Sequence, residues 1–132
     1  MKLTQEIKNI LSKNGLALKN YPDLQKNKEA VLIAVNENGW ALRYASEELR
    51  ADKEVVIDAV KINGYALQWA SDELRSDKEV VLTAVKQDGY ALEYASDDLK
   101  DNDKIVIIAM KTTTRAIEFA SKRIQNYGKE YE

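Results

Sequence analysis

The sequence predicts an all-α protein made of tandem helix-turn-helix repeats of 25 residues that stack as a short α-solenoid. When the chain is shifted by 25 positions it matches itself, and residues 52–76 and 77–101 are identical at 16 of 25 positions. Apolar residues within each unit recur at the i, i+3 and i+4 spacing of a helix, and strand-like alternation is absent. Self-similarity at a fixed period of this length is the signature of a repeat architecture.

We expect a single domain, 1–132, divided into five units and a tail. Residues 27–51 match 52–76 at 14 positions, whereas residues 102–126 match 77–101 at only 7. The first and last units are therefore degenerate, as expected where a terminal repeat lacks one neighbour. The predicted units are about 1–26, 27–51, 52–76, 77–101 and 102–126, followed by the tail 127–132.

Three columns of alanine recur once per unit, and aliphatic residues recur beside them. Small residues at fixed spacing indicate that helices approach closely, and the leucines and isoleucines fill the space between them. The alanine columns are Ala34, Ala59, Ala84 and Ala109, then Ala41, Ala66, Ala91 and Ala116, then Ala45, Ala70, Ala95 and Ala120; the aliphatic columns are Leu42, Leu67, Leu92 and Ile117, and Leu49, Leu74, Leu99 and Ile124.

Each unit is predicted to hold two short helices. Asp52 is a good N-cap for the first helix of its unit, and Glu54 complements the helix dipole. Gly64 is expected to end this helix, because glycine takes positive φ. The second helix is expected to run as far as Leu74, with Ser71 starting a separate turn as the alternative.

Composition excludes several chemistries. The chain has no Cys and no His, so thiolate sites, disulfides and the commonest general base are excluded. Its net charge of -2 makes nucleic acid an improbable partner. The N-terminus has no signal-peptide pattern and no segment is apolar enough to span a membrane, so we expect a cytoplasmic protein.

The segment DKEVVIDAVKINGYALQWASDELR, residues 52–75, resembles the bacterial helical repeats called domain of unknown function forty-one-sixteen. The resemblance covers roughly 27–126 and weakens after Asn102, where Thr114 stands in the glycine position. It implies the fold, and it implies no activity, catalytic residue or cofactor.

Two aromatic columns are the main candidates for a binding surface. Because they lie four residues apart, each pair is expected to share one helix face. We interpret Tyr44, Trp69, Tyr94 and Phe119 as packing between units, since the aromatic character persists in the last unit. We predict that Trp40, Tyr65, Tyr90 and Arg115 bind a partner, because the change from Tyr to Arg indicates solvent exposure.

Other repeated features have simpler interpretations. The carboxylate pairs Glu47-Glu48, Asp72-Glu73 and Asp97-Asp98 indicate a solvated acidic edge, since adjacent helical residues do not face one substrate. The lysine column Lys61, Lys86 and Lys111 shares its face with glutamates. Asp101-Asn102-Asp103 lacks the Gly and the distal Glu of a calcium loop.

The sequence therefore predicts a non-enzymatic module that binds a protein or peptide, with no catalytic, metal or cofactor site and no membrane partner. The alternatives are an enzyme that uses Asp, Glu, Lys or Tyr, and a weak nucleic-acid binder acting through the lysine column. Residues that vary between units mark a second possible binding face, where we expect exposed apolar side chains at Ile33, Ile62 and Ile108.

Overall fold

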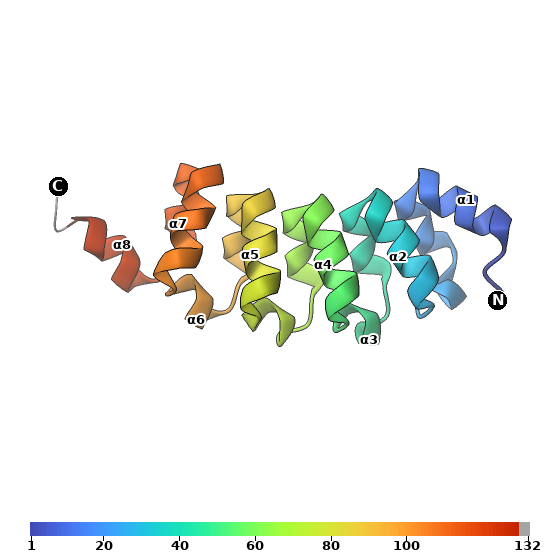
Figure 1. Ribbon diagram of the computed structural model, residues 1–132. Helices are drawn as coiled ribbons and strands as arrows, with labels where there is room; N and C mark the ends of the chain where they lie inside the picture. The colour runs from blue at the N-terminus through green and yellow to red at the C-terminus, as the bar shows by residue number, and fades with distance from the viewer. Residues whose placement is uncertain (130–132) are drawn as a thin grey trace.

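A computed structural model describes residues 1–129, which form helices and contain no strand. Five α-helices stand side by side in a row that runs from the N-terminus to the C-terminus (Figure 1). The predicted α-solenoid is confirmed, and neighbouring units pack on one another in chain order. The five helices are α1 (Gln5–Lys13), α2 (Lys28–Glu37), α4 (Lys53–Ile62), α5 (Lys78–Gln87) and α7 (Asp103–Thr112).

Each of these helices is followed by a six-residue 3-10 helix, which forms the second layer of the stack. The 3-10 helix packs against the α-helix of its own unit and, in every unit but the last, against the α-helix of the next unit. The five 3-10 helices are η1 (Gly15–Asn20), η3 (Gly39–Tyr44), η4 (Gly64–Trp69), η6 (Gly89–Tyr94) and η7 (Thr114–Phe119).

The second predicted helix does not run on to Leu74. Ala70 is extended, with φ -70° and ψ 158°, so η4 ends at Trp69. The Ser71 hydroxyl then accepts a hydrogen bond from the Leu74 amide at 3.3 Å and starts a separate turn, as in the alternative prediction. These turns are η2 (Pro22–Leu24), α3 (Glu47–Arg50), η5 (Leu74–Ser76) and α6 (Asp97–Lys100), and α8 (Lys122–Lys129) occupies this place in the last unit.

The predicted tail, 127–132, begins within α8. Residues 127–129 belong to α8, and residues 130–132 lie outside the described part of the chain. Every helix among residues 1–129 is too short or too polar to cross a lipid bilayer.

The core is one continuous cluster that extends from Leu11 to Ala120. Many of its side chains come from the predicted columns. All four alanines of the Ala34 column are fully buried, and Leu42, Leu67 and Leu92 are fully buried between the layers. N-caps start the long helices as predicted, because the Asp52 and Asp77 carboxylates accept from the amides of Val55 and Val80. Asn27 and Asn102 perform the same task in other units.

The glycine column comprises Gly15, Gly39, Gly64 and Gly89. Glycine is needed at these positions because the next helix approaches closely, and not because of a special backbone conformation. None of the glycines of this column has positive φ, which corrects the prediction from sequence. A Cβ atom on Gly64 would stand 2.5 Å from the carbonyl oxygen of Ala84, in the α-helix of the next unit. The same collision would occur between Gly15 and Ala34, Gly39 and Ala59, and Gly89 and Ala109.

Thr114 shows where this requirement ends. It occupies the glycine position in the last unit, and its side chain is exposed. Within residues 1–129 it is followed by α8, which leaves the row of helices (Figure 1). Among residues 1–129 no α-helix of a following unit packs on η7 as α5 packs on η4. The sequence therefore departs from glycine where the neighbouring helix that requires it is not present in the described chain.

Gly64→Ala should lower the free energy of unfolding by about 1–3 kcal/mol, because the new methyl group is forced into the Ala84 backbone. Thr114→Ala is the matched control at the equivalent position, and it should change stability by no more than roughly 0.5 kcal/mol. Urea denaturation of both variants measures the difference. Equal effects would mean that close approach is not what selects glycine.

Polar contacts reinforce the stacking on both layers. The amide of Ser71 donates to the Arg50 carbonyl of the preceding unit at 3.0 Å, and Ser46, Ser96 and Ser121 repeat this bond. On the α layer, the Lys53 ammonium lies 3.0 Å from the Asp77 carboxylate and 2.8 Å from that of Glu79. Lys28 pairs with Asp52 and Glu54 in the same way.

These ion pairs perturb the N-cap carboxyls. Burial raises the pKa of Asp77, but the hydrogen bonds from Lys53 and from the backbone amides of Val80 and Glu79 outweigh it, so the pKa is lowered overall. The pKa of Asp52 is lowered for the same reasons. A lowered pKa in the folded state means that the ionised group stabilises the fold above its ordinary pKa of about 3.9 and stops doing so below the lowered value.

The double variant Asp52→Asn/Asp77→Asn should therefore be less stable than the wild-type protein near neutral pH, and the gap should close as the pH falls below about 4. Asparagine keeps the capping oxygen, as Asn27 and Asn102 show, so the change isolates the charge. Melting temperatures at a series of pH values report it. A gap that stays constant down to pH 2 would contradict the ionic contribution.

Candidate binding surface

The two aromatic columns meet across units and not within them. The ring centroids of Trp40 and Trp69 lie 4.8 Å apart with an interplanar angle of 63°. Tyr65 and Tyr94 lie 6.0 Å apart at 74°, an edge-to-face geometry. The third pair, Tyr90 with Phe119, has the same 6.0 Å separation.

The expectation that rings four residues apart share a helix face is wrong, because these rings lie on 3-10 helices. With three residues per turn, positions four apart point about 120° away from each other. Each ring at the start of a 3-10 helix therefore meets the ring at the end of the next one. We call the resulting surface the aromatic edge; it comprises Trp40, Tyr44, Tyr65, Trp69, Tyr90, Tyr94 and Phe119.

The two aromatic columns differ less in burial than predicted, because of the outer rings only Trp40 is exposed. Tyr44, Trp69, Tyr94 and Phe119 are half-buried and pack against the core. Trp40 is 36% exposed, whereas Tyr65 and Tyr90 are half-buried and lie outside the set of side chains packed on the core. The first column therefore anchors the rings of the second, and the second forms the outer part of the edge.

Arginines flank the edge at both ends. Arg115, the predicted last member of the outer column, is exposed, and its Nε lies 3.2 Å from the Glu118 carboxylate. Arg43 was not singled out from the sequence. Its guanidinium lies 5.2 Å from the centre of the Tyr44 ring and 5.8 Å from that of Trp69, within cation–π range. The signal for it was weak, since Arg43 is simply the one basic member of a variable column.

The C-terminal half of the edge is acidic. Burial, with the nearby Asp88 carboxylate as the next contribution, raises the pKa of the Tyr65 hydroxyl. Burial and the neighbouring Glu93 raise the pKa of Tyr94. Negative charge therefore surrounds the Tyr65–Tyr94 pair, and it disfavours ionisation of these hydroxyl groups.

Two equivalent clefts lie between successive units beside this edge. The first has a volume of about 400 Å³ and is lined by Glu47, Arg50, Gln68 and Asp72, among others. The second, about 280 Å³, uses the positions one repeat later, including Asp72, Arg75, Tyr94 and Asp97. The first member of each carboxylate pair, Glu47, Asp72 or Asp97, thus lines a cleft between units. The side chains of all three pairs are exposed, as predicted.

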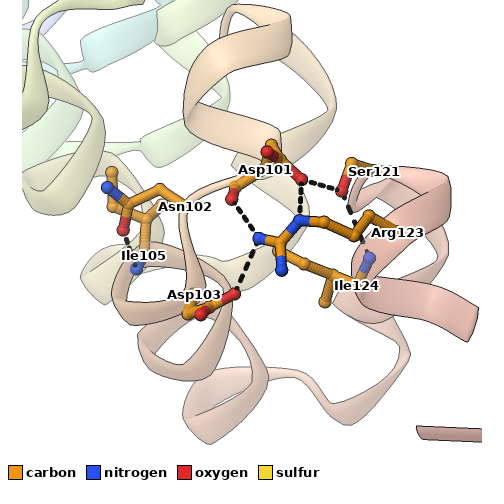
Figure 2. A network of polar contacts seen from close by, with 7 residues as sticks. All are labelled: Asp101, Asn102, Asp103, Ile105, Ser121, Arg123 and Ile124. Atoms are coloured by element: carbon orange, nitrogen blue, oxygen red, sulfur yellow. Dashed lines mark hydrogen bonds and ion pairs between the residues drawn. The ribbon is translucent and has the colours of Figure 1, made fainter. Parts of the chain in front are cut away.

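Asp101 and Asp103 hold the last helix in place (Figure 2). Arg123 on α8 has its Nε 2.8 Å from Asp101 and its Nη2 3.0 Å from Asp103. Hydrogen bonds from Ser121 and Arg123 lower the pKa of Asp101. Asn102 accepts from the Ile105 amide and caps α7. The segment is therefore a joint between helices, and no group of three or more side chains suited to a metal occurs in the described chain.

An apolar pocket of about 490 Å³ lies at the C-terminal end, between α7, η7 and α8. It exists because the stack ends there, leaving Ile107 56% exposed where its counterpart Leu82 is partly covered. Its acidic residue, Asp103, is 71% exposed and paired with Arg123. The described residues include no fully buried polar or charged side chain.

The remaining candidates from the sequence are the lysine column and the apolar residues of the variable face. Lys61, Lys86 and Lys111 are exposed along the α layer, as the sequence predicts. The expectation of exposed apolar residues on the variable face is partly wrong. Ile62 is 44% exposed, but Ile33 and Ile108 are half-buried against the core.

The repeats match one known family. Its description, "Domain of unknown function (DUF4116)", fits residues 6–50, 27–75, 52–100 and 77–125 in overlapping copies. The chain belongs to this family. The copies advance in steps of about one repeat, which confirms the resemblance found at residues 52–75 and extends it into both degenerate units. No curated protein and no solved structure matches the chain significantly.

Trp40→Ala should lower the free energy of unfolding by about 0.5–1.5 kcal/mol, the typical contribution of an edge-to-face ring pair. Trp69→Ala loses the same pair and also contact with the core, so it should cost at least about 1 kcal/mol more. Urea midpoints of the two variants test this order. Equal costs would mean that Trp40 is as much a core residue as Trp69.

Proposed function

We propose that the protein is a non-enzymatic helical repeat module that binds a protein or peptide partner along the aromatic edge. The observation that carries this proposal is the set of three ring pairs, each joining one unit to the next and each partly exposed. Large aromatic side chains dominate the energetics of interfaces, and here packing already orders them, which reduces the entropic cost of binding.

The arrangement favours an extended partner. One ring pair occurs at each of three successive junctions between units, so equivalent contacts repeat along the row of 3-10 helices. A repeat protein presents such a surface as a strip and not as a single concave site. A segment of another protein that lies along the strip would contact Trp40, Tyr65 and Tyr90 in turn, with Arg115 at the far end.

The alternatives have weaker support. An enzyme built on Asp, Glu, Lys or Tyr would need a pocket with a desolvated ionisable group, and the one acid of the apolar pocket is exposed and paired. A nucleic-acid site on Lys61, Lys86 and Lys111 would share its layer with several carboxylates, including Glu54 and Glu79.

The test uses a displayed library of random peptides, selected against the full chain. Selected peptides should lose most of their affinity for Trp40→Ala/Tyr65→Ala and keep it for Lys61→Ala/Lys86→Ala, measured by calorimetry. The only two tryptophans of the chain are Trp40 and Trp69, so peptide binding should also change the intrinsic fluorescence of the wild-type protein.

Melting temperatures of both double variants separate loss of binding from loss of folding. Peptides that bind the aromatic variant as well as the wild-type protein would place the binding surface elsewhere. Loss of affinity in the lysine variant alone would favour the α layer and its lysine column.

A further inference from the structure

The aromatic edge and the inter-unit clefts form one surface, because Tyr94 belongs to both. Its ring packs against Tyr65, and the same side chain lines the cleft between Asp72 and Asp97. The equivalent cleft one repeat earlier is lined by Glu47 and Asp72. A partner lying on the edge would therefore pass the mouth of one cleft per unit.

Most carboxylates on this surface have no ion pair, in contrast to those at the N-terminal ends of α4 and α5. Asp52, Glu54, Asp77 and Glu79 are all held by lysines of the preceding unit. Beside the clefts only Asp72 has an ion-pair partner, Arg75. Within residues 1–129, Glu47 and Asp97, which line the clefts, have no ion-pair partner within 4 Å. The same holds for their exposed sequence neighbours in the three acidic pairs, Glu48, Glu73 and Asp98.

The basic residues of the same turns offset only part of this charge. Arg50, Arg75 and Lys100 stand against the six carboxylates of the three acidic pairs, and Arg75 is already paired with Asp72. Glu93 and Asp88 add further negative charge near the Tyr65–Tyr94 pair. The surface is therefore complementary to a cation, and its aromatic rings add cation–π contacts for lysine or arginine.

The spacing of the units determines the spacing of the charges that fit. Packed helices lie about 8–10 Å apart. An extended chain in the polyproline II conformation advances about 9 Å in three residues. A side chain at every third position of such a segment would therefore meet equivalent positions of successive units.

The row of acidic pairs also has a defined end. It occurs in the three middle units, and the last unit, 102–126, carries Lys122 and Arg123 at the same positions. Arg123 is turned toward Asp101 and Asp103 and pairs with both, so no unpaired acidic pair follows in this unit (Figure 2). The acidic surface thus spans three units.

Building on the proposed function, we propose that the partner is an extended cationic segment with Lys or Arg at positions i, i+3 and i+6. Its basic side chains lie against the carboxylates of three successive units, and its backbone follows the aromatic edge. The rings supply the contact area, and the unpaired carboxylates select the charge and the spacing.

Synthetic peptides test the proposal with the full chain. The first carries three lysines at i, i+3 and i+6 in a Ser/Pro background; comparators place the lysines at i, i+2 and i+4, or replace each lysine by glutamate. The first peptide should bind most tightly, change the tryptophan fluorescence, and lose affinity as the salt concentration rises. Equal or tighter binding of the glutamate peptide or of the respaced peptide would overturn the proposal.

A matched pair of variants tests the acidic residues. Glu47→Gln/Asp97→Asn removes one unpaired carboxylate from each cleft and should weaken binding of the first peptide by about 2- to 30-fold. Glu6→Gln/Glu37→Gln makes the same change in net charge on α1 and α2, and should weaken it by less than about 2-fold. Equal losses in both pairs would show that only net charge matters and would contradict the clefts as the site.

The outcomes distinguish this inference from the proposed function. If neutral or acidic library peptides bind and depend on Trp40 and Tyr65, the aromatic edge binds partners but the cationic specificity is wrong. If the lysine peptide binds independently of Trp40 and Tyr65 but depends on Glu47 and Asp97, the acidic row binds without the edge, and both statements fail in their present form.

Discussion

The approach of one glycine to one carbonyl oxygen determines the distance between units, and the rest of the structure depends on that distance. A Cβ atom on Gly64 would collide with the Ala84 carbonyl, and three other glycines make the same contact. At this spacing the buried alanines fit between helices, and rings on successive 3-10 helices come within 4.8–6.0 Å of each other. The clefts between units result from the same separation.

The two layers of the stack use their charges differently. On the α layer, lysines of one unit bind the N-cap carboxylates of the next, so charge is used to hold units together. On the layer of 3-10 helices and turns, backbone hydrogen bonds from the serine column perform this task. Except for Asp72, which pairs with Arg75, the exposed carboxylate pairs of the turns then take no part in holding the units together, and neither do the outer faces of the rings. We therefore expect binding on this layer, where the polar side chains are not needed to hold the units together.

The ends of the stack follow the same physical constraint. Thr114 replaces glycine where no α-helix of a further unit packs within residues 1–129. Asp103 stands in the position that lysine occupies in the inner units. Asp103 binds Arg123 of α8, so the ionic pattern of the α layer ends in a contact with the last helix. The apolar pocket at this end contains side chains whose counterparts elsewhere are covered by a following unit.

The sequence by itself determined the repeat length, the N-caps and the buried columns, and it predicted the division into five units. Each of these depends on the spacing of residues along the chain, which is the same however the units are arranged in space. It also marked Trp40, Tyr65, Tyr90 and Arg115 as an outer column. Only the tertiary structure decided that the second helix is a 3-10 helix, since a six-residue segment is too short for periods of 3.0 and 3.6 to be told apart. The ring pairs and the role of glycine depend on residues about 20 to 29 positions apart in sequence. Such contacts are created by stacking, and no local pattern encodes them.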